Sequence, residues 1–348
     1  MTPPASTQNA KFRESGNREP NNRGTALSAL VIGVAALALL SVIALMVGAV
    51  PMPVRAVFNA LFGRGDPTDV SIIRDLRAPR LLMAALVGAG LATSGGALQG
   101  TLRNPLAEPY LLGVSGGAAV GAVIAMSLGI DQPIAVTIAA FVGAASATIC
   151  VSLIARIVAG RTDARMLLMA GVVVGAFANA AILVMLAGVP ADRLRGALWW
   201  MMGSAANATW DGVGRLALAV LVFGGALLWL ARELDVLALG EEPAAALGAN
   251  VDKTSRQIFL LASFLAAATV AAAGLVGFVG LVVPNIARAM GARNHRPMLV
   301  LSAVYGAALL IFADVVARTA RAPAELPLGA ITALIGVPFF LVRLRKIS

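Results

Sequence analysis

The sequence is poor in the residues that catalysis and metal binding require. Its 348 residues include one cysteine, one histidine and three lysines, and charged residues make up 13% of the chain. One cysteine excludes an intrachain disulfide, and no group of Cys, His, Asp and Glu has metal-ligand spacing. A Gly-rich phosphate loop that ends in Gly-Lys-Ser/Thr is also absent. We therefore expect a non-enzymatic chain without a cofactor, and any ATP to be bound by a partner.

Apolar residues dominate instead. They account for 59% of the chain and fall into blocks of about twenty, the length at which a helix crosses a bilayer. These blocks predict an all-α, polytopic membrane protein with about ten transmembrane helices. The expected spans are 26–50, 80–100, 109–129, 133–156, 165–188, 212–231, 256–274, 277–292, 298–317 and 327–343.

Residues 1–25 are polar and rich in Pro, Asn and Arg, which predicts a flexible tail. The next run is too long and too far from the start to be a signal peptide, so we expect it to be retained as a span. Residues 26–348 then form a single transmembrane domain. Glycine and alanine recur at every fourth position over 88–100, and glycine does so over 113–121, which predicts closely packed helices.

Arginines account for most of the net charge of +10 and flank the apolar blocks. This pattern is typical of membrane topology and argues against nucleic-acid binding, leaving lipid as the expected surroundings. Ten spans put both termini on one side, and that side carries more Lys and Arg. The positive-inside rule then predicts an inner-membrane protein with cytosolic termini. The outer side is still rich in arginine, which suggests an acidic partner.

Ion coupling usually requires ionisable groups within the membrane. Asp314 is the one convincing candidate, and it lies four residues before Arg318, the spacing of an ordinary helical pair. His295 stands among Arg293, Asn294 and Arg296, and we interpret it as a solvated loop residue. An ion-driven secondary transporter is therefore a weaker alternative to a permease that a partner energises.

Two connections contain predicted short helices. Between the sixth and seventh spans, residues 232–254 form a cytosolic connection in which Glu241, Glu242 and Pro243 begin a helix and the residues from Gly248 end it. On the outer side, the tryptophans near residue 200 predict a helix at the membrane interface.

Several long motifs then resemble one family. They are RAPR at 77–80, SGG at 94–96, RNPLAEP at 103–109, LLGVSGG at 111–117, LGEEPAAALG at 239–248, GFVGLVVPNIAR at 277–288 and ELPLGAITALIGVPFF at 325–340. The chain resembles the permeases of ATP-binding-cassette (ABC) importers for iron-siderophore complexes, haem and cobalamin. The resemblance runs in order from about residue 30 to the C-terminus.

The resemblance implies the type II permease fold of ABC importers and a set of partners. These are a second permease copy or a close paralogue, two cytosolic ATPase subunits and an extracytoplasmic substrate-binding protein. It also implies alternating access, with a ferric siderophore as the expected cargo and haem or cobalamin as the alternative. Many relatives have histidine at the position of Asn285, and this departure leaves the cargo open.

The resemblance also assigns roles to residues. It implies that Arg77, Arg80 and Arg318 dock the binding protein. The alternative is that these arginines anchor helix ends at the lipid headgroups. Coupling to the ATPases falls to Gly240, Glu241, Glu242, Ala246, Leu247 and Gly248, which could instead form an ordinary surface helix. The pathway and its gate fall to Gln99, Asn104, Leu106 and Met201, although Pro105 could simply make a turn there.

Overall fold

The computed structural model describes residues 22–160 and 163–344, and the regular elements in these ranges are all helices. They are α1 (Asn22–Met46), α2 (Val54–Leu61), α3 (Pro67–Ser71), η1 (Ile72–Arg77), α4 (Ala78–Thr101), η2 (Pro109–Leu112), α5 (Val114–Ser127), α6 (Pro133–Ala159), α7 (Ala164–Ala187), α8 (Ala191–Met202), α9 (Trp210–Ala219), η3 (Val220–Gly224), α10 (Gly225–Trp229), α11 (Ala231–Ala238), α12 (Glu241–Ala246), α13 (Val251–Ala273), α14 (Val279–Ala289), α15 (His295–Thr319) and α16 (Leu328–Leu344). The predicted all-α class is confirmed.

Seven helical segments are long and apolar enough to cross a membrane, and each matches a predicted span. The other three predicted spans correspond to the shorter apolar helices α5, α14 and α16. The second long segment begins at Pro67 rather than near residue 80, because α3, η1 and α4 are continuous. Residues 1–21 of the predicted tail lie outside the described residues, and α1 already begins at Asn22.

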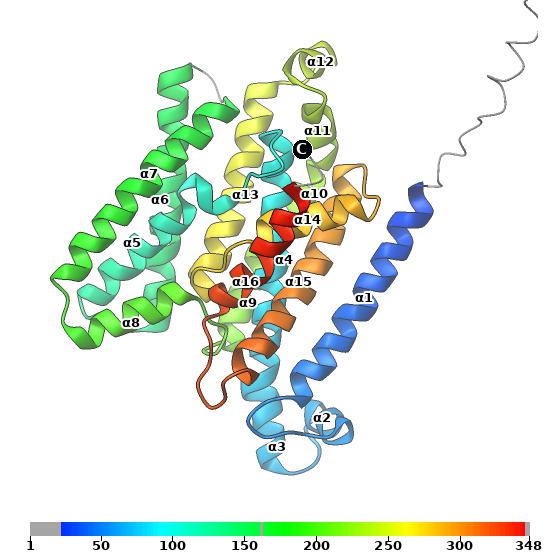
Figure 1. Ribbon diagram of the computed structural model, residues 1–348, viewed down its shortest axis with the longest axis vertical. Coiled ribbons are helices and arrows are strands. Elements are labelled where there is room, and N and C mark those ends of the chain that lie inside the picture. The colour runs from blue at the N-terminus through cyan, green and yellow to red at the C-terminus, as the bar shows by residue number, and fades with distance from the viewer. Residues whose placement is uncertain (1–21, 161–162, 345–348) are drawn as a thin grey trace, which may run out of the picture.

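The helices α4, α13 and α15 run through the centre of the bundle (Figure 1), and all of residues 90–101 in α4 are buried. Small residues make this packing possible, as their spacing predicted. A Cβ on Gly88 would collide with the backbone carbonyl of Gly306 in α15, and one on Gly95 would collide with Gly280 in α14. The close approach therefore depends on the missing side chains.

One predicted span is interrupted, and the predicted boundary between two others has an irregular backbone. The third predicted span breaks at Gly113, which has a φ of 80° and separates η2 from α5. Between α13 and α14, Gly274 has a φ of 73° and Phe278 a φ of 67°. A positive φ is strained for a residue with a side chain, so Phe278 needs support from its surroundings.

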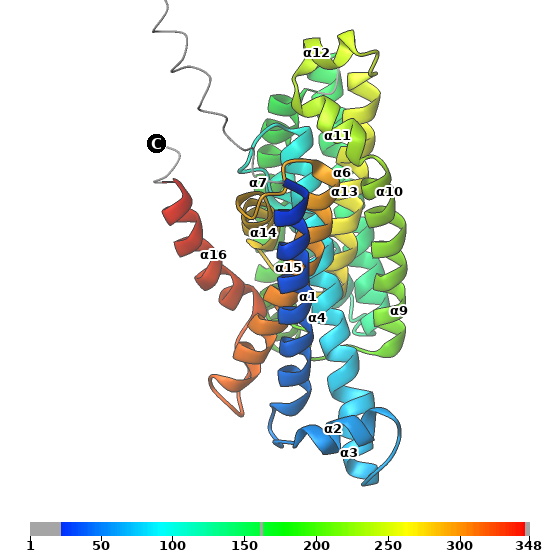
Figure 2. The ribbon, with the colours of Figure 1, turned by 90° about the vertical axis from the view of Figure 1, so that its right-hand side faces the viewer.

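The short elements mark the two ends of the bundle. The helices α2 and α3 lie at one end and α12 lies at the other (Figure 1). The first described residues of α1 and the end of α16 lie in the half that contains α12 (Figure 2). Both described chain ends are therefore on one side of the bundle, as an even number of crossings requires.

Candidate functional site

The two helix breaks meet inside the bundle. The Glu108 Oε1 atom accepts a hydrogen bond from the backbone N–H of Phe278 at 2.7 Å. The Tyr110 hydroxyl accepts one from the backbone N–H of Val276 at 2.5 Å. These bonds satisfy donors that the interruption before α14 would otherwise leave unpaired. Discontinuous helices of this kind form the substrate pathways of many transporters.

Sequence analysis missed Glu108 and Tyr110. Glu108 stands within the RNPLAEP motif, directly before the apolar block that begins at Pro109. An acidic residue at such a boundary is weak evidence of a buried functional group, because most carboxylates there are solvated. Its partner lies 170 positions along the chain, and only the fold shows that they meet.

A polar network joins α4, α14 and the connection after α4. Gln99 is 3% exposed, and its Nε2 atom donates to the Gly280 carbonyl at 3.1 Å. The Arg288 Nη1 atom donates to Gln99 Oε1 at 2.8 Å and to Asn285 Oδ1 at 3.2 Å. Asn285 Nδ2 donates in turn to the carbonyl of Pro105 at 3.2 Å. The Asn285 side chain thus accepts a hydrogen bond from Arg288 of its own helix, α14, and donates one to the connection after α4.

Of the other predicted gate residues, Asn104 adjoins this network, because its backbone N–H donates to the Gln99 carbonyl at 3.1 Å. Asn104 Oδ1 accepts from the backbone N–H of Leu106 at 2.9 Å, so the turn at Pro105 that was considered as an alternative is present. Leu106 is 39% exposed. Met201 lies near the end of α8 and packs, half-buried, against a cluster that includes Val123 of α5. The structure therefore brings Gln99 and Asn104 near one another and puts Met201 elsewhere.

The predicted coupling segment is a separate helix, α12, at one end of the bundle (Figure 1). Gly240 precedes it with a φ of 113°, and Gly248 follows it with a φ of 83°. The Arg103 Nη2 atom lies 3.0 Å from Glu241 Oε1, which connects α12 to the turn after α4. Leu247 is 67% exposed and Glu242 is also exposed, so α12 presents both apolar and acidic groups to its surroundings.

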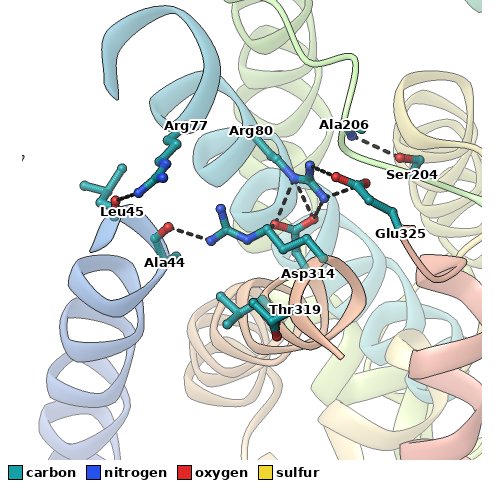
Figure 3. A network of polar contacts seen from close by, with 11 residues as sticks. Ala44, Leu45, Arg77, Arg80, Ser204, Ala206, Asp314, Thr319 and Glu325 are labelled. Atoms are coloured by element: carbon teal, nitrogen blue, oxygen red, sulfur yellow. Dashed lines mark hydrogen bonds and ion pairs between the residues drawn. The ribbon is translucent and has the colours of Figure 1, made fainter. Parts of the chain in front are cut away.

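At the opposite end, Arg80 joins two acidic residues (Figure 3). Its Nη2 atom lies 2.9 Å from Asp314 Oδ1 in α15, and its Nη1 atom lies 2.7 Å from Glu325 Oε1 in the following loop. The Arg80 side chain is 13% exposed and that of Asp314 is 5% exposed. The bridge therefore holds α4, α15 and the loop before α16 together.

The other two predicted docking arginines bind the end of α1. Arg77 is 8% exposed and donates to the carbonyls of Leu45, at 2.6 Å, and Val50. Arg318 donates to the carbonyl of Ala44 at 2.5 Å, while its Nε atom lies 3.7 Å from Asp314, the pair that the spacing predicted. Both guanidinium groups serve carbonyls that a helix end leaves unpaired.

His295 differs from its prediction as a solvated loop residue. It is the first residue of α15, and its side chain is 12% exposed. Its backbone N–H donates to Asp235 Oδ1 at 2.8 Å, and its Nδ1 atom lies 2.7 Å from the same oxygen. The neighbouring arginines suggested solvent, but the contact with α11 covers the ring.

A protein-family model decides the classification, because it matches residues 36–346, nearly the whole chain, and describes the FecCD transport family. The chain belongs to the FecCD transport family.

Several named permeases are similar to this chain over most of their length. The cobalamin import permease BtuC of Halobacterium salinarum is 45% identical over 86% of this chain and 80% of that protein. The hemin transport permease HmuU of Yersinia pestis is 39% identical over 77% of this chain and 81% of that protein. The Fe(3+)-citrate import permease YfmE of Bacillus subtilis is 36% identical over 92% and 95%.

A solved metal-chelate type ABC transporter in an inward-facing conformation has a similar fold. It superimposes with a TM-score of 0.81 at 30% identity and covers 91% of this chain and 98% of its own. Family and fold confirm the resemblance and the ABC permease type. The chain is therefore a multi-pass membrane protein of a transport family.

Proposed function

We propose that this FecCD-family permease imports a ferric siderophore by alternating access, with the ATP hydrolysed by two separate cytosolic subunits. The carrying observation is the contact between Arg103 and Glu241 at 3.0 Å. It supports a route by which a force on α12 reaches the turn at Asn104 and Leu106. From there, the hydrogen bond between Asn285 and Pro105 continues the route to α14.

The ATPase subunits would contact α12 through Gly240, Glu241, Glu242, Ala246, Leu247 and Gly248. The exposed Leu247 supports this role, since an isolated apolar side chain beside acidic groups suits a groove on a partner. In this orientation the α12 end and both termini face the cytosol, and the end with α2 and α3 faces outward.

A substrate-binding protein would dock at the outward end near Arg77, Arg80 and Arg318. Arg77 and Arg80 (Figure 3) come from η1 and α4 and Arg318 from α15, and their convergence supports a shared electrostatic surface. Each guanidinium group already has partners within the chain, so docking requires an exchange of partners. Of the two carboxylates paired with Arg80, Glu325 is the one that a docking partner could replace. Its side chain is 39% exposed, whereas that of Asp314 is 5% exposed.

The pathway would lie between two permease copies, either identical or paralogous. Support comes from the packing of a single copy, in which residues 90–101 are buried and leave no passage along α4. Gln99, Asn104 and Leu106 would close its cytosolic end, and Met201 would lie near its outer mouth.

A comparison of uptake between candidate cargoes tests this proposal. The complete importer in proteoliposomes should take up a ferric siderophore when ATP is enclosed with its ATPase subunits, and should take up haem or cobalamin much more slowly. A second candidate, cobalamin, is favoured by the 45% identical cobalamin permease. Preferential cobalamin uptake would replace the cargo assignment, whereas accumulation without the ATPase subunits would overturn the ABC mechanism.

A further inference from the structure

A groove opens between α6 and α9. Its volume is about 790 Å³. We call it the α6–α9 groove, and its apolar walls include Ile138, Phe141, Leu216, Phe223, Ala268 and Ala272. This volume lies within the range of small-molecule sites, which is roughly 300–1,000 Å³.

The groove exists because of the small residues of α13. Both α6 and α9 pack on α13. At the level of the groove, α13 contributes Ala268, Ala271 and Ala272, whose methyl groups leave the space between the two flanking helices unfilled. Ile138 on α6 is 56% exposed, and Leu218 on α9 is also exposed, so the groove lies beside an apolar outer surface. Such a surface faces lipid in a membrane protein.

The groove spans about one leaflet. Its α6 wall extends from Pro133 to Phe141, which at the helical rise is about 12 Å, and its other wall extends from Gly212 to Phe223, about 16 Å. Half of the hydrocarbon thickness of a bilayer is about 15 Å. The polar end of the groove lies at the α2–α3 end of the bundle, because the Trp210 indole N–H donates to the carbonyl of Arg74.

Charges of both signs stand at this polar end. Arg215, Asp131 and Glu325 line it, together with Asn207 and Thr209. Glu325 is paired with Arg80, whereas Arg215 and Asp131 are exposed and form no ion pair with another described residue. A zwitterionic phospholipid carries the complementary pair, a phosphate for Arg215 and a primary amine for Asp131. Its acyl chain matches the apolar walls below.

We propose that the α6–α9 groove binds one amine-bearing phospholipid, of the phosphatidylethanolamine type, with its phosphate at Arg215 and one acyl chain between α6 and α9. The lipid fills space that α13 leaves open and so stabilises α9 against the core. The site lies away from α12, and Glu325 at its polar end also pairs with Arg80.

Native mass spectrometry of the detergent-purified full chain tests the proposal. The delipidated protein is titrated with phosphatidylethanolamine or phosphatidylglycerol of identical acyl chains. The wild type should retain one phosphatidylethanolamine at least tenfold more tightly than phosphatidylglycerol. Ala272→Phe, which fills the groove, should abolish that binding, while Ala38→Phe on the exposed surface of α1 should not. Arg215→Ala should weaken it about tenfold, while Arg64→Ala at the same end should leave it unchanged.

Ala272→Leu is a milder second variant in case Ala272→Phe does not fold. A photo-crosslinking residue at Ile138 identifies the occupant directly, and attachment to an acyl chain is the expected product. Equal retention of both lipids, retention that survives both Ala272 variants, or a crosslink to a second copy of the chain would each overturn the assignment. Displacement of the lipid by the metal chelate would also overturn it and assign the groove to the cargo.

Discussion

Arg80 and Asp314 are 234 positions apart in the chain, yet their side chains meet at 2.9 Å. The Arg80 Nε atom also donates to both carboxylate oxygens of Asp314, at 3.0 and 3.1 Å. This two-pronged geometry is the strong form of an arginine–carboxylate contact. A buried pair of this kind fixes the relative position of α4 and α15, and removing one partner leaves the other charge uncompensated.

Asp314→Asn should therefore destabilise the protein strongly. We expect a loss of about 3 kcal/mol in unfolding free energy, because Arg80 keeps Glu325 but loses its most buried partner. Thermal unfolding in detergent measures the effect. Asp211→Asn, an exposed carboxylate at the start of α9, is the matched control and should change stability by less than about 0.5 kcal/mol. Equal stability of the two variants would contradict a structural role for the pair.

Glu325→Gln tests whether Arg80 takes part in docking. If a carboxylate of the binding protein replaces Glu325, the variant should bind that protein more tightly, because the competing internal charge is gone. An exposed pair is worth up to about 1 kcal/mol, so the gain should be about fivefold or less. It should shrink at high salt, where exposed charges are screened.

Surface plasmon resonance with the importer in nanodiscs measures this affinity at two salt concentrations. Asp211→Asn again serves as the control for a lost negative charge at the same end. Weaker binding by Glu325→Gln would show that Glu325 orients Arg80 rather than competing for it. Loss of binding in Arg77→Glu needs a parallel stability measurement, because Arg77 also holds the end of α1.

A charge exchange tests the connection between α12 and the gate. Arg103→Glu should leave stability within about 1 kcal/mol, since the side chains of Arg103 and Glu241 are 39% and 35% exposed. It should nevertheless lower cargo uptake per ATP hydrolysed. Arg103→Glu combined with Glu241→Arg should restore coupling if the contact itself transmits the motion. ATP hydrolysis and uptake measured in the same proteoliposomes give the ratio, and a double variant no better than the single one would exclude this route.

Much of this arrangement was predictable from local composition. Apolar block length identified the spans, and Glu241, Pro243 and Gly248 identified α12 because helix ends depend on near neighbours. The break at Gly113 was missed, since a window of apolar residues does not register a single positive φ. The break between α13 and α14 coincides with the predicted boundary at 274–277, although the positive φ of Phe278 was not predicted. Contacts such as that of Glu108 with Phe278 join segments far apart in the chain. A single sequence does not show which distant segments meet in the fold.

The glycine spacing was only partly informative. It predicted close packing of helices but not which helix packs against α4. The structure identifies that partner for Gly88, whose missing side chain leaves room for the backbone of Gly306. Since both positions are glycine, an added Cβ on either helix meets backbone atoms of the other, and no flexible side chain can move aside to make room. The contact between α4 and α15 thus has little tolerance for added volume.

Gly88→Ala should therefore destabilise the protein by about 1–3 kcal/mol, the range for overpacked interiors, despite the higher helix propensity of alanine. Gly214→Ala is the matched control, because a Cβ there meets nothing within 4 Å in the described structure. It should stabilise α9 by about 0.5–1 kcal/mol through propensity alone. Thermal unfolding of both variants in detergent gives the comparison. Opposite signs would establish that backbone proximity, rather than glycine content, determines stability at this crossing, and a neutral Gly88→Ala would contradict the packing described here.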